Sequence, residues 1–333
     1  MKIVSKFGKN ELIRFAPYIG ICLIFIILPF LTGSYILSIV TKAIIFALFA
    51  MSLDILFGYM NLITMGHALY FGTAAFTAGY LMVKQGITSF WVCSGLGTLG
   101  AGLLAAITGP IALRVYGMYF MLVTLALGQL GYTVIFKYIR EPGLEGMVGI
   151  KYPTLGIPGL VLNTDGFYYL VFAVFAVCFF LLYRLVRSPF GYAIQGIRQD
   201  ETRMKSIGYN TWLYKYIAFI IAGLFAGLAG TLFAYYSGVI VANHVGVFTS
   251  VYVILMVIIG GPGTLFGPIL GSFILVSLEN IISAFTPERW YFILGVVFVL
   301  AAMFLRGGIW VYLLKARDKI RGMGYLHHGD IKG

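Results

Sequence analysis

Long apolar runs alternate with short polar segments along most of the chain. Runs of about 18 or more apolar residues are typical of transmembrane helices, and a soluble core does not require so many of them. The pattern therefore predicts an all-α, polytopic helical membrane protein with about ten transmembrane helices, some of them short or broken. The predicted spans are 16–31, 36–57, 63–83, 90–113, 117–136, 167–186, 213–236, 248–260, 265–283 and 290–305.

The run 248–260 differs from the others in length. It is too short to cross a bilayer without tilt or a flanking extension, so it is a candidate half of a broken helix. Residues 1–15 are polar and basic, and no small-residue cleavage site follows 16–31, which indicates a retained span rather than a cleaved signal peptide. We therefore expect a cytoplasmic N-terminal tail (1–15), a transmembrane domain (16–310) and a cytoplasmic C-terminal tail (311–333).

Composition supports the membrane class. The chain is 61% hydrophobic and only 10% charged, whereas soluble domains are roughly half apolar with about a quarter of their residues charged. The net charge of +12 does not indicate nucleic-acid binding here, because Lys and Arg concentrate in the cytoplasmic loops of membrane proteins.

The distribution of basic residues predicts the orientation. With about ten spans and a cytoplasmic N-terminus, the inside segments hold 17 of the 23 Lys and Arg residues, the outside segments hold five, and Lys42 lies in a span. The chain is therefore expected in the cell membrane with both termini and the loop 187–212 in the cytoplasm.

The spans divide equally between residues 16–136 and 167–310. An odd number of spans per half makes the halves inverted relative to each other, a common plan in transporters. The segment between them, 137–166, contains Pro142, Gly143, Pro153, Pro158 and Gly159, which predicts an external loop rather than a helix.

Two glycine-rich stretches, GYMNLITMGHALYFG (58–72) and GGPGTLFGPILG (260–271), lie one in each half. Such stretches can interrupt a helix at membrane depth against protein or a water-filled cavity, and the free N-termini of half-helices favour an anionic group. Ordinary turns between helices are the alternative. The candidate translocation path comprises Asn61, Thr64, Gly66, His67, Gly261, Gly263 and Thr264. Gly223, Gly227 and Gly230 instead have the spacing of close helix packing.

Catalytic and metal-binding motifs are missing from the sequence. It contains no G-x-x-x-x-G-K-[ST], H-E-x-x-H or G-x-S-x-G, so we expect neither an enzyme nor a metal site. Cys22, Cys93 and Cys178 all lie in apolar runs and are expected to be buried, unpaired thiols. The ionisable residues within spans are Asp54, His67 and Glu279, of which the two acids are expected near span ends, in contact with water.

The most highly charged interior stretch is SPFGYAIQGIRQDETRMKSIGYN, residues 188–210. It has room for a cytoplasmic helix of about four turns. Ala193, Ile197, Met204 and Ile207 fall near one face, whereas Arg198, Glu201 and Lys205 fall on another, spaced for weak ion pairs. Such a helix binds either an anionic lipid surface or a soluble protein. The mixture of acidic and basic residues favours a protein.

Four stretches of the chain carry a family resemblance: SLDILFGYMNLITMGHALYFGTAAFTAGYL, MYFMLVTLALGQ, SPFGYAIQGIRQDETRMKSIGYNTWLYKYIAFIIAGLFAGLAGTLFAYY and VIIGGPGTLFGPILGS. Over roughly residues 36–310, the chain resembles the permeases of branched-chain amino-acid ABC importers of the LivM type. That family also includes urea and short-chain amide permeases. Asn61 and Thr64 depart from the Gln and Ser that are more frequent in it, and the linker REPGLEGMVGI departs from its usual glycine pattern.

The resemblance implies a permease subunit that moves Leu, Ile and Val into a bacterial or archaeal cell by alternating access. It would work with a second permease, two ATPase subunits that hold ATP and Mg, and an extracytoplasmic binding protein, while binding no cofactor itself. Residues about 191–208 would form the coupling helix that docks on an ATPase, through Gly191, Ile197, Arg198, Glu201, Arg203, Met204, Lys205, Ile207 and Gly208. The alternatives are a urea or short-chain amide permease and, from another class, an ATP-independent channel or carrier.

Overall fold

The structure, a computed structural model, describes residues 25, 28–29, 32–138, 146–155, 163–285, 290–304 and 307–312. Almost all of the described chain is helical, as predicted. The helices are α2 (Ser34–Met60), α3 (Ala68–Gln85), α4 (Phe90–Ala112), α5 (Met118–Tyr138), α6 (Thr164–Val186), α7 (Pro189–Gln199), α8 (Glu201–Ser206), α9 (Thr211–Ser237), α10 (Val247–Gly260), α11 (Phe266–Phe285) and α12 (Trp290–Phe304). The span expected at 16–31 lies almost entirely outside the described residues, as do the two tails.

Each expected span from 36–57 onward coincides with a helix. Six described helices are long and apolar enough to cross a membrane by length and composition: α2, α4, α5, α6, α9 and α11. The shorter helices α3, α10 and α12 occupy the remaining expected ranges without belonging to this group. The membrane class is therefore supported, and the number of crossings stays a prediction.

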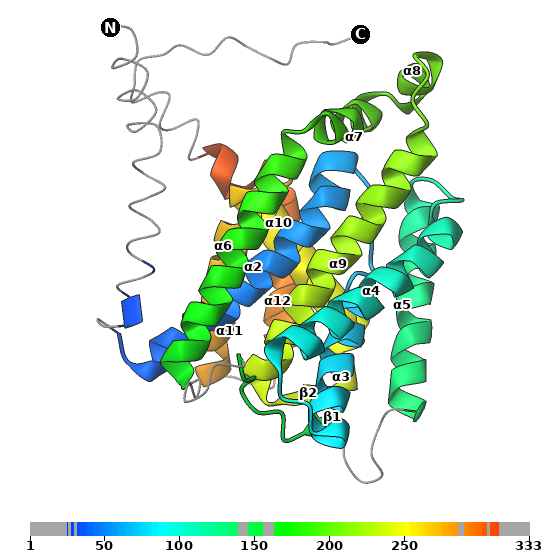
Figure 1. Ribbon diagram of the computed structural model, residues 1–333. Helices are drawn as coiled ribbons and strands as arrows, with labels where there is room; N and C mark the ends of the chain where they lie inside the picture. The colour runs from blue at the N-terminus through cyan, green and yellow to red at the C-terminus, as the bar shows by residue number, and fades with distance from the viewer. Residues whose placement is uncertain are drawn as a thin grey trace, which may run out of the picture.

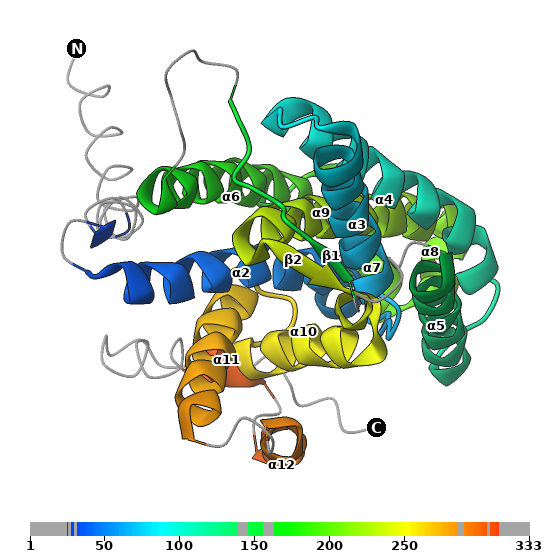
Figure 2. The same ribbon diagram turned by 90° about the horizontal axis from the view of Figure 1, so that it is seen from below.

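The centre of the bundle is formed by α2 and α9 (Figures 1 and 2). They contact each other and run antiparallel: α2 ends beside α7, at the end of the bundle where α9 begins (Figure 1). Both are mostly buried, whereas α5 and α6 expose most of their surface. Seen end-on in Figure 2, α5 and α12 lie at the periphery.

The helix contacts follow a repeated pattern. Both α3 and α4 pack on α9 and on each other, and in the same way α10 and α11 pack on α2 and on each other. The two short helices also begin side by side, since the N–H of Ala68, the first residue of α3, donates to Ser250 Oγ of α10 over 3.0 Å. Each central helix is thus surrounded mainly by helices from the other half of the chain.

Glycines in α9 allow these close contacts. A Cβ on Gly230 would collide with the backbone carbonyl of Phe71 in α3, and a Cβ on Gly223 or Gly227 would meet the alanine side chains of α4. Small residues permit such approach between helices where water exclusion gives no driving force. The packing role predicted for these glycines is confirmed.

Both glycine-rich stretches lie between successive helices. After α2, Asn61 takes a left-handed conformation with φ of 58°. Non-helical backbone then runs beside α5, where Met65 N–H donates to Thr124 Oγ1 (3.2 Å), before α3 begins. The turn from α10 to α11 needs Gly261 and Gly263, whose φ values are 119° and 77°. Positive φ at two positions explains why glycine is required there.

The linker is not entirely loop. Gly146–Val148 forms strand β1, which pairs antiparallel with β2 (Val239–Val241) after α9, and a short 3-10 helix η1 (Ala242–Val245) then leads into α10. The sequence prediction missed this two-stranded sheet, because its strands are too short to carry a periodic signal. Cys93 and Cys178 are buried free thiols, as expected, and Cys22 lies outside the described residues.

Substituting alanine at Gly230 should destabilise the bundle by about 1–3 kcal/mol, because the added methyl group is forced against the backbone of α3. Thermal unfolding of the purified protein in mild detergent measures this effect. Gly95→Ala is the matched control: a Cβ there meets nothing within 4 Å, so stability should stay unchanged or rise by up to about 1 kcal/mol. Equal melting temperatures for both variants would contradict the packing argument.

Candidate functional site

The charged segment at one end of the bundle forms two helices instead of one (Figure 1). The expected continuous helix of four turns is wrong, because Asp200 is extended (φ −157°, ψ 100°) and separates α7 from α8. Its Oδ1 accepts the N–H of Arg203 over 2.9 Å and so caps α8. A short carboxylate that satisfies a free N–H favours such a helix start over a helix interior.

The apolar residues of this segment divide between the protein core and the surface. Ile197 is only 4% exposed, and Met204 packs its sulfur against Gly196. Ile207 is 64% exposed. Gly191 packs tightly on the end of α6, and Gly208 takes a left-handed turn with φ of 93° after α8. Of the expected apolar anchors, Ile207 is therefore the one with a largely exposed side chain.

Glu201 is the centre of an ionic network that joins α8 to α9. It forms an ion pair with Lys215 of α9 and another with Lys205 at 3.0 Å, and it accepts a hydrogen bond from Thr211 at 3.0 Å. Burial by itself would raise the pKa of Glu201, but the hydrogen bonds from Lys215, Lys205 and Thr211 outweigh burial and lower it. The expected Glu201–Lys205 pair is thus present.

Arg198 points away from Glu201 and towards the membrane-spanning helices. Its Nη1 donates to the carbonyl of Gly58 in the last turns of α2 and lies next to Gly263 in the turn between α10 and α11. Asp54 Oδ1 accepts the N–H of that same Gly263 over 2.8 Å. We call this cluster of Asp54, Gly58, Arg198 and Gly263 the glycine junction. It joins α7 to both glycine-rich stretches.

Asp54 is completely buried in this junction. The expectation that it is in contact with water is therefore wrong, whereas its expected position near a span end is confirmed, in the last turns of α2. The local sequence predicts that Asp54 lies in a helix. Its burial depends on α7 and the α10–α11 turn, which pack over it. Its Oδ2 has no hydrogen-bond partner among the described residues.

The residues expected to line the path are spread through the bundle. Asn61 is exposed, Thr64 and His67 are buried, and His67 Nε2 lies 2.9 Å from Ser52 Oγ. Gly66 packs on the backbone of α5. Thr264 serves its own turn: its Oγ1 donates to Gly261 and accepts the N–H of Gly267. The two stretches meet where Gly58 contacts Gly263.

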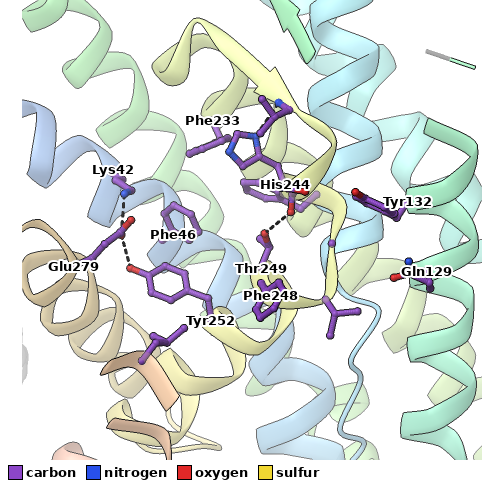
Figure 3. A pocket seen from close by; sticks show the side chains of 16 residues that line it. Lys42, Phe46, Gln129, Tyr132, Phe233, His244, Phe248, Thr249, Tyr252 and Glu279 are labelled. Atoms are coloured by element: carbon purple, nitrogen blue, oxygen red, sulfur yellow. Dashed lines mark hydrogen bonds and ion pairs between the residues drawn. The ribbon is translucent and has the colours of Figure 1, made fainter. Parts of the chain in front are cut away.

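A cavity of about 750 Å³ opens where α3 and α10 begin, at the β2–η1 side of the bundle (Figure 3). Helices α2, α3, α5, α9, α10, α11 and α12 and the β2–η1 segment all contribute side chains to it. The lining residues are Lys42, Phe46, Phe71, Gln129, Tyr132, Phe233, Val241, Asn243, His244, Gly246, Val247, Phe248, Thr249, Tyr252, Glu279 and Leu294. None of the expected path residues is among them.

An ion pair lies in the wall of this cavity (Figure 3). Lys42 Nζ of α2 is 2.8 Å from Glu279 Oε2 of α11, and the Tyr252 hydroxyl donates to the same oxygen over 2.8 Å. The sequence shows Lys42 and Glu279 only as isolated ionisable residues within spans. Their pairing was missed because nothing local indicates that α2 and α11 pack together.

A bundle of helices long and apolar enough to cross a membrane, with a cavity at one end and a charged segment at the other, fits a transport protein. The family model for the permease component of the branched-chain amino acid transport system matches residues 35–302. The chain belongs to this family, so it is a permease component of an ABC transporter, as the sequence motifs indicate.

Individual relatives agree with the family. The chain is 28% identical to the high-affinity branched-chain amino acid permease protein LivM of Escherichia coli, over 84% of this chain and 71% of that protein. It is 24% identical to the probable LivM of Methanocaldococcus jannaschii, over 75% and 81%. A shorter match, 33% identical over 25% and 27%, is to the guanosine permease protein NupQ of Bacillus subtilis. No solved structure matches.

Replacing Glu201 with Gln should destabilise the protein by about 1–3 kcal/mol, because it leaves Lys215, whose side chain is 8% exposed, without its counter-charge. The contribution of Glu201 is present above its ordinary pKa and declines as the pH falls through its lowered folded-state pKa. Melting temperatures of the wild type should therefore drop in acid more steeply than those of Glu201→Gln.

Arg203→Gln is the control for this measurement. Arg203 is 82% exposed and lies 3.6 Å from Asp200, so its loss should change stability by less than about 0.5 kcal/mol. If Arg203→Gln lowered the melting temperature as much as Glu201→Gln, the effect of Glu201→Gln could not be assigned to its contact with Lys215.

Proposed function

We propose that this permease carries branched-chain amino acids, Leu, Ile and Val, into a bacterial or archaeal cell as part of an ATP-driven importer. The observation that carries this proposal is the family match over residues 35–302 together with LivM relatives that extend over most of the chain. The short match to a guanosine permease covers only a quarter of the chain, so it does not favour a nucleoside.

The importer proposed here contains a second permease, two ATPase subunits that hold ATP and Mg, and a binding protein on the outer side. Substrate passes between the two permeases by alternating access. About ten spans in two inverted halves fit this arrangement. In support, α2 and α9 run antiparallel and are each packed by equivalent helices of the opposite half.

The segment α7–α8 is the proposed ATPase-docking element on the cytoplasmic side. It lies at the end of the bundle and exposes Tyr192 (65%) and Ile207 (64%) beside charged side chains. Large apolar side chains exposed among charges are typical of protein contact surfaces. Ile197, Arg198 and Glu201 have a structural role in this element. Their contacts attach α7–α8 to the rest of the chain.

The glycine junction is the proposed route by which motion of α7–α8 reaches the spans. Arg198 donates a hydrogen bond to α2 and contacts the α10–α11 turn. Asp54 of α2 accepts a hydrogen bond from the backbone of that turn. A displacement of α7 by an ATPase would therefore act directly on the turn that contains Gly261 and Gly263. The hydrogen bonds of Arg198 and Asp54 require a specific geometry, which apolar packing alone does not.

The tagged chain, purified from its native membrane with its partners and reconstituted in liposomes, should take up labelled leucine only when ATP and the binding protein are supplied. Mass spectrometry of the same sample should find an ATPase and a second permease. Uptake of labelled urea in place of leucine would assign the urea and amide branch of the family. Uptake without ATP would contradict the importer and identify a channel or carrier.

Arg198→Met should uncouple the transporter. The ATPase subunits should remain bound, because the exposed surface of α7–α8 is unchanged, while leucine uptake falls at least about tenfold when the link to Gly58 and Gly263 is lost. Uptake and ATP hydrolysis measured on one preparation test this expectation. Arg114→Met is the matched control, since Arg114 is exposed in the loop between α4 and α5. Equal coupling ratios in the two variants would remove Arg198 from the transmission route.

A further inference from the structure

The pair Lys42–Glu279 is unusual in its surroundings. The two side chains lie within α2 and α11, which are candidate membrane spans, yet they are 20% and 24% exposed and face the cavity. Ionisable residues that line an interior cavity are by default candidates for ligand contact.

The geometry of the pair leaves hydrogen-bonding capacity for a ligand. Lys42 Nζ and the Tyr252 hydroxyl both bond Glu279 Oε2. Among the described residues no hydrogen bond is made to Oε1, which leaves it to accept from an added donor. An ammonium group has three N–H donors and no acceptor. Lys42 can therefore keep its bond to Glu279 while it donates to a carboxylate, and Glu279 can accept from an ammonium group.

The rest of the wall has the character of an apolar side-chain pocket. Phe46, Phe71, Phe233, Phe248 and Leu294 line the same cavity. The first turn of α10 also borders it, beginning at Gly246, and the positive end of that helix favours a carboxylate as Lys42 does. Apolar walls with a few placed polar groups are typical of small-molecule sites, and the volume of about 750 Å³ falls in their usual range.

We propose that the cavity is a transient binding site for a zwitterionic α-amino acid, in which Lys42 holds the carboxylate, Glu279 holds the ammonium group and the phenylalanines hold the aliphatic side chain. This inference rests on the proposed function. One positive and one negative group match a ligand that carries one of each. A ligand with a single charge contacts only one member of the pair and adds an unbalanced charge to the cavity.

The location of the cavity agrees with a site that receives substrate from a binding protein. It lies at the β2–η1 side, whereas α7 and the glycine junction lie at the opposite end of the bundle (Figure 1). With α7–α8 docked on an ATPase, the cavity faces the side on which a binding protein delivers substrate. An amino acid held there stands between its release from the binding protein and the closed part of the bundle near Asp54.

The test uses the reconstituted complex in nanodiscs without binding protein, with L-leucine as the probe and its methyl signals followed by saturation-transfer NMR. The wild type should bind leucine at least about tenfold more tightly than leucinamide, which lacks the carboxylate, or 4-methylpentanoate, which lacks the ammonium group. This comparison needs no variant. Equal binding of the three compounds, or no binding of leucine, would overturn the proposal.

Lys42→Met and Glu279→Gln should each lower leucine binding and ATP-driven leucine uptake at least about tenfold, both measured per amount of assembled complex. Lys151→Met and Asp165→Asn are the matched controls, because they remove exposed charges outside the cavity and should leave both measurements as in the wild type.

The outcomes that contradict the proposed function differ from those that contradict only this inference. A wild-type complex that takes up no leucine contradicts the proposed function itself. A wild type that takes up leucine while Lys42→Met and Glu279→Gln do so equally well overturns only this inference. If the single variants do not assemble, the comparison of leucine with leucinamide and 4-methylpentanoate on the wild type decides the inference. Equal binding of the three compounds would then overturn it.

Discussion

The contact of α9 with α3 and α4 is the constraint on which the rest of the bundle depends. In a membrane, helices associate through close packing, because the surrounding lipid is as apolar as their side chains. Gly223, Gly227 and Gly230 bring the backbone of α9 directly against its neighbours. With α9 held in this way against one half of the chain and α2 against the other, the short helices α3 and α10 begin together in the interior, and the cavity forms around their first turns.

The non-helical backbone between α2 and α3 and between α10 and α11 bonds to neighbouring parts of the protein. Such partners matter in a membrane protein, because lipid offers no hydrogen bonds to free backbone groups. At the glycine junction Asp54 accepts the N–H of Gly263 and Arg198 donates to the carbonyl of Gly58. The same contacts that satisfy the backbone also attach α7 to the spans. In the proposed importer, the residues that satisfy the backbone are therefore also those that transmit motion.

The two charged clusters, the glycine junction and the Lys42–Glu279 pair, differ in how far they are exposed. The junction is closed, with Asp54 completely buried under the α10–α11 turn. The pair Lys42–Glu279 faces a cavity and stays partly exposed. In the proposed importer, the cavity would receive the solute and the junction would transmit the movement of the ATPase. The two clusters lie towards opposite ends of the same central helix, α2.

The sequence by itself determined the helices, their approximate ends and the positions of the glycine-rich breaks, because apolar runs and glycine act locally. The family also follows from motifs within the chain, and the ion pair of Glu201 with Lys205 follows from helical spacing. Only the tertiary structure decided that Lys42 meets Glu279, 237 positions away, and that Arg198 meets Gly58, 140 positions away. It also decided the break at Asp200, the pairing of β1 with β2 and the burial of Asp54. These features depend on which helices pack together. Hydrophobicity in a membrane specifies that a helix is inserted but does not select its neighbours, which are chosen by the fit of small residues and polar contacts between distant segments.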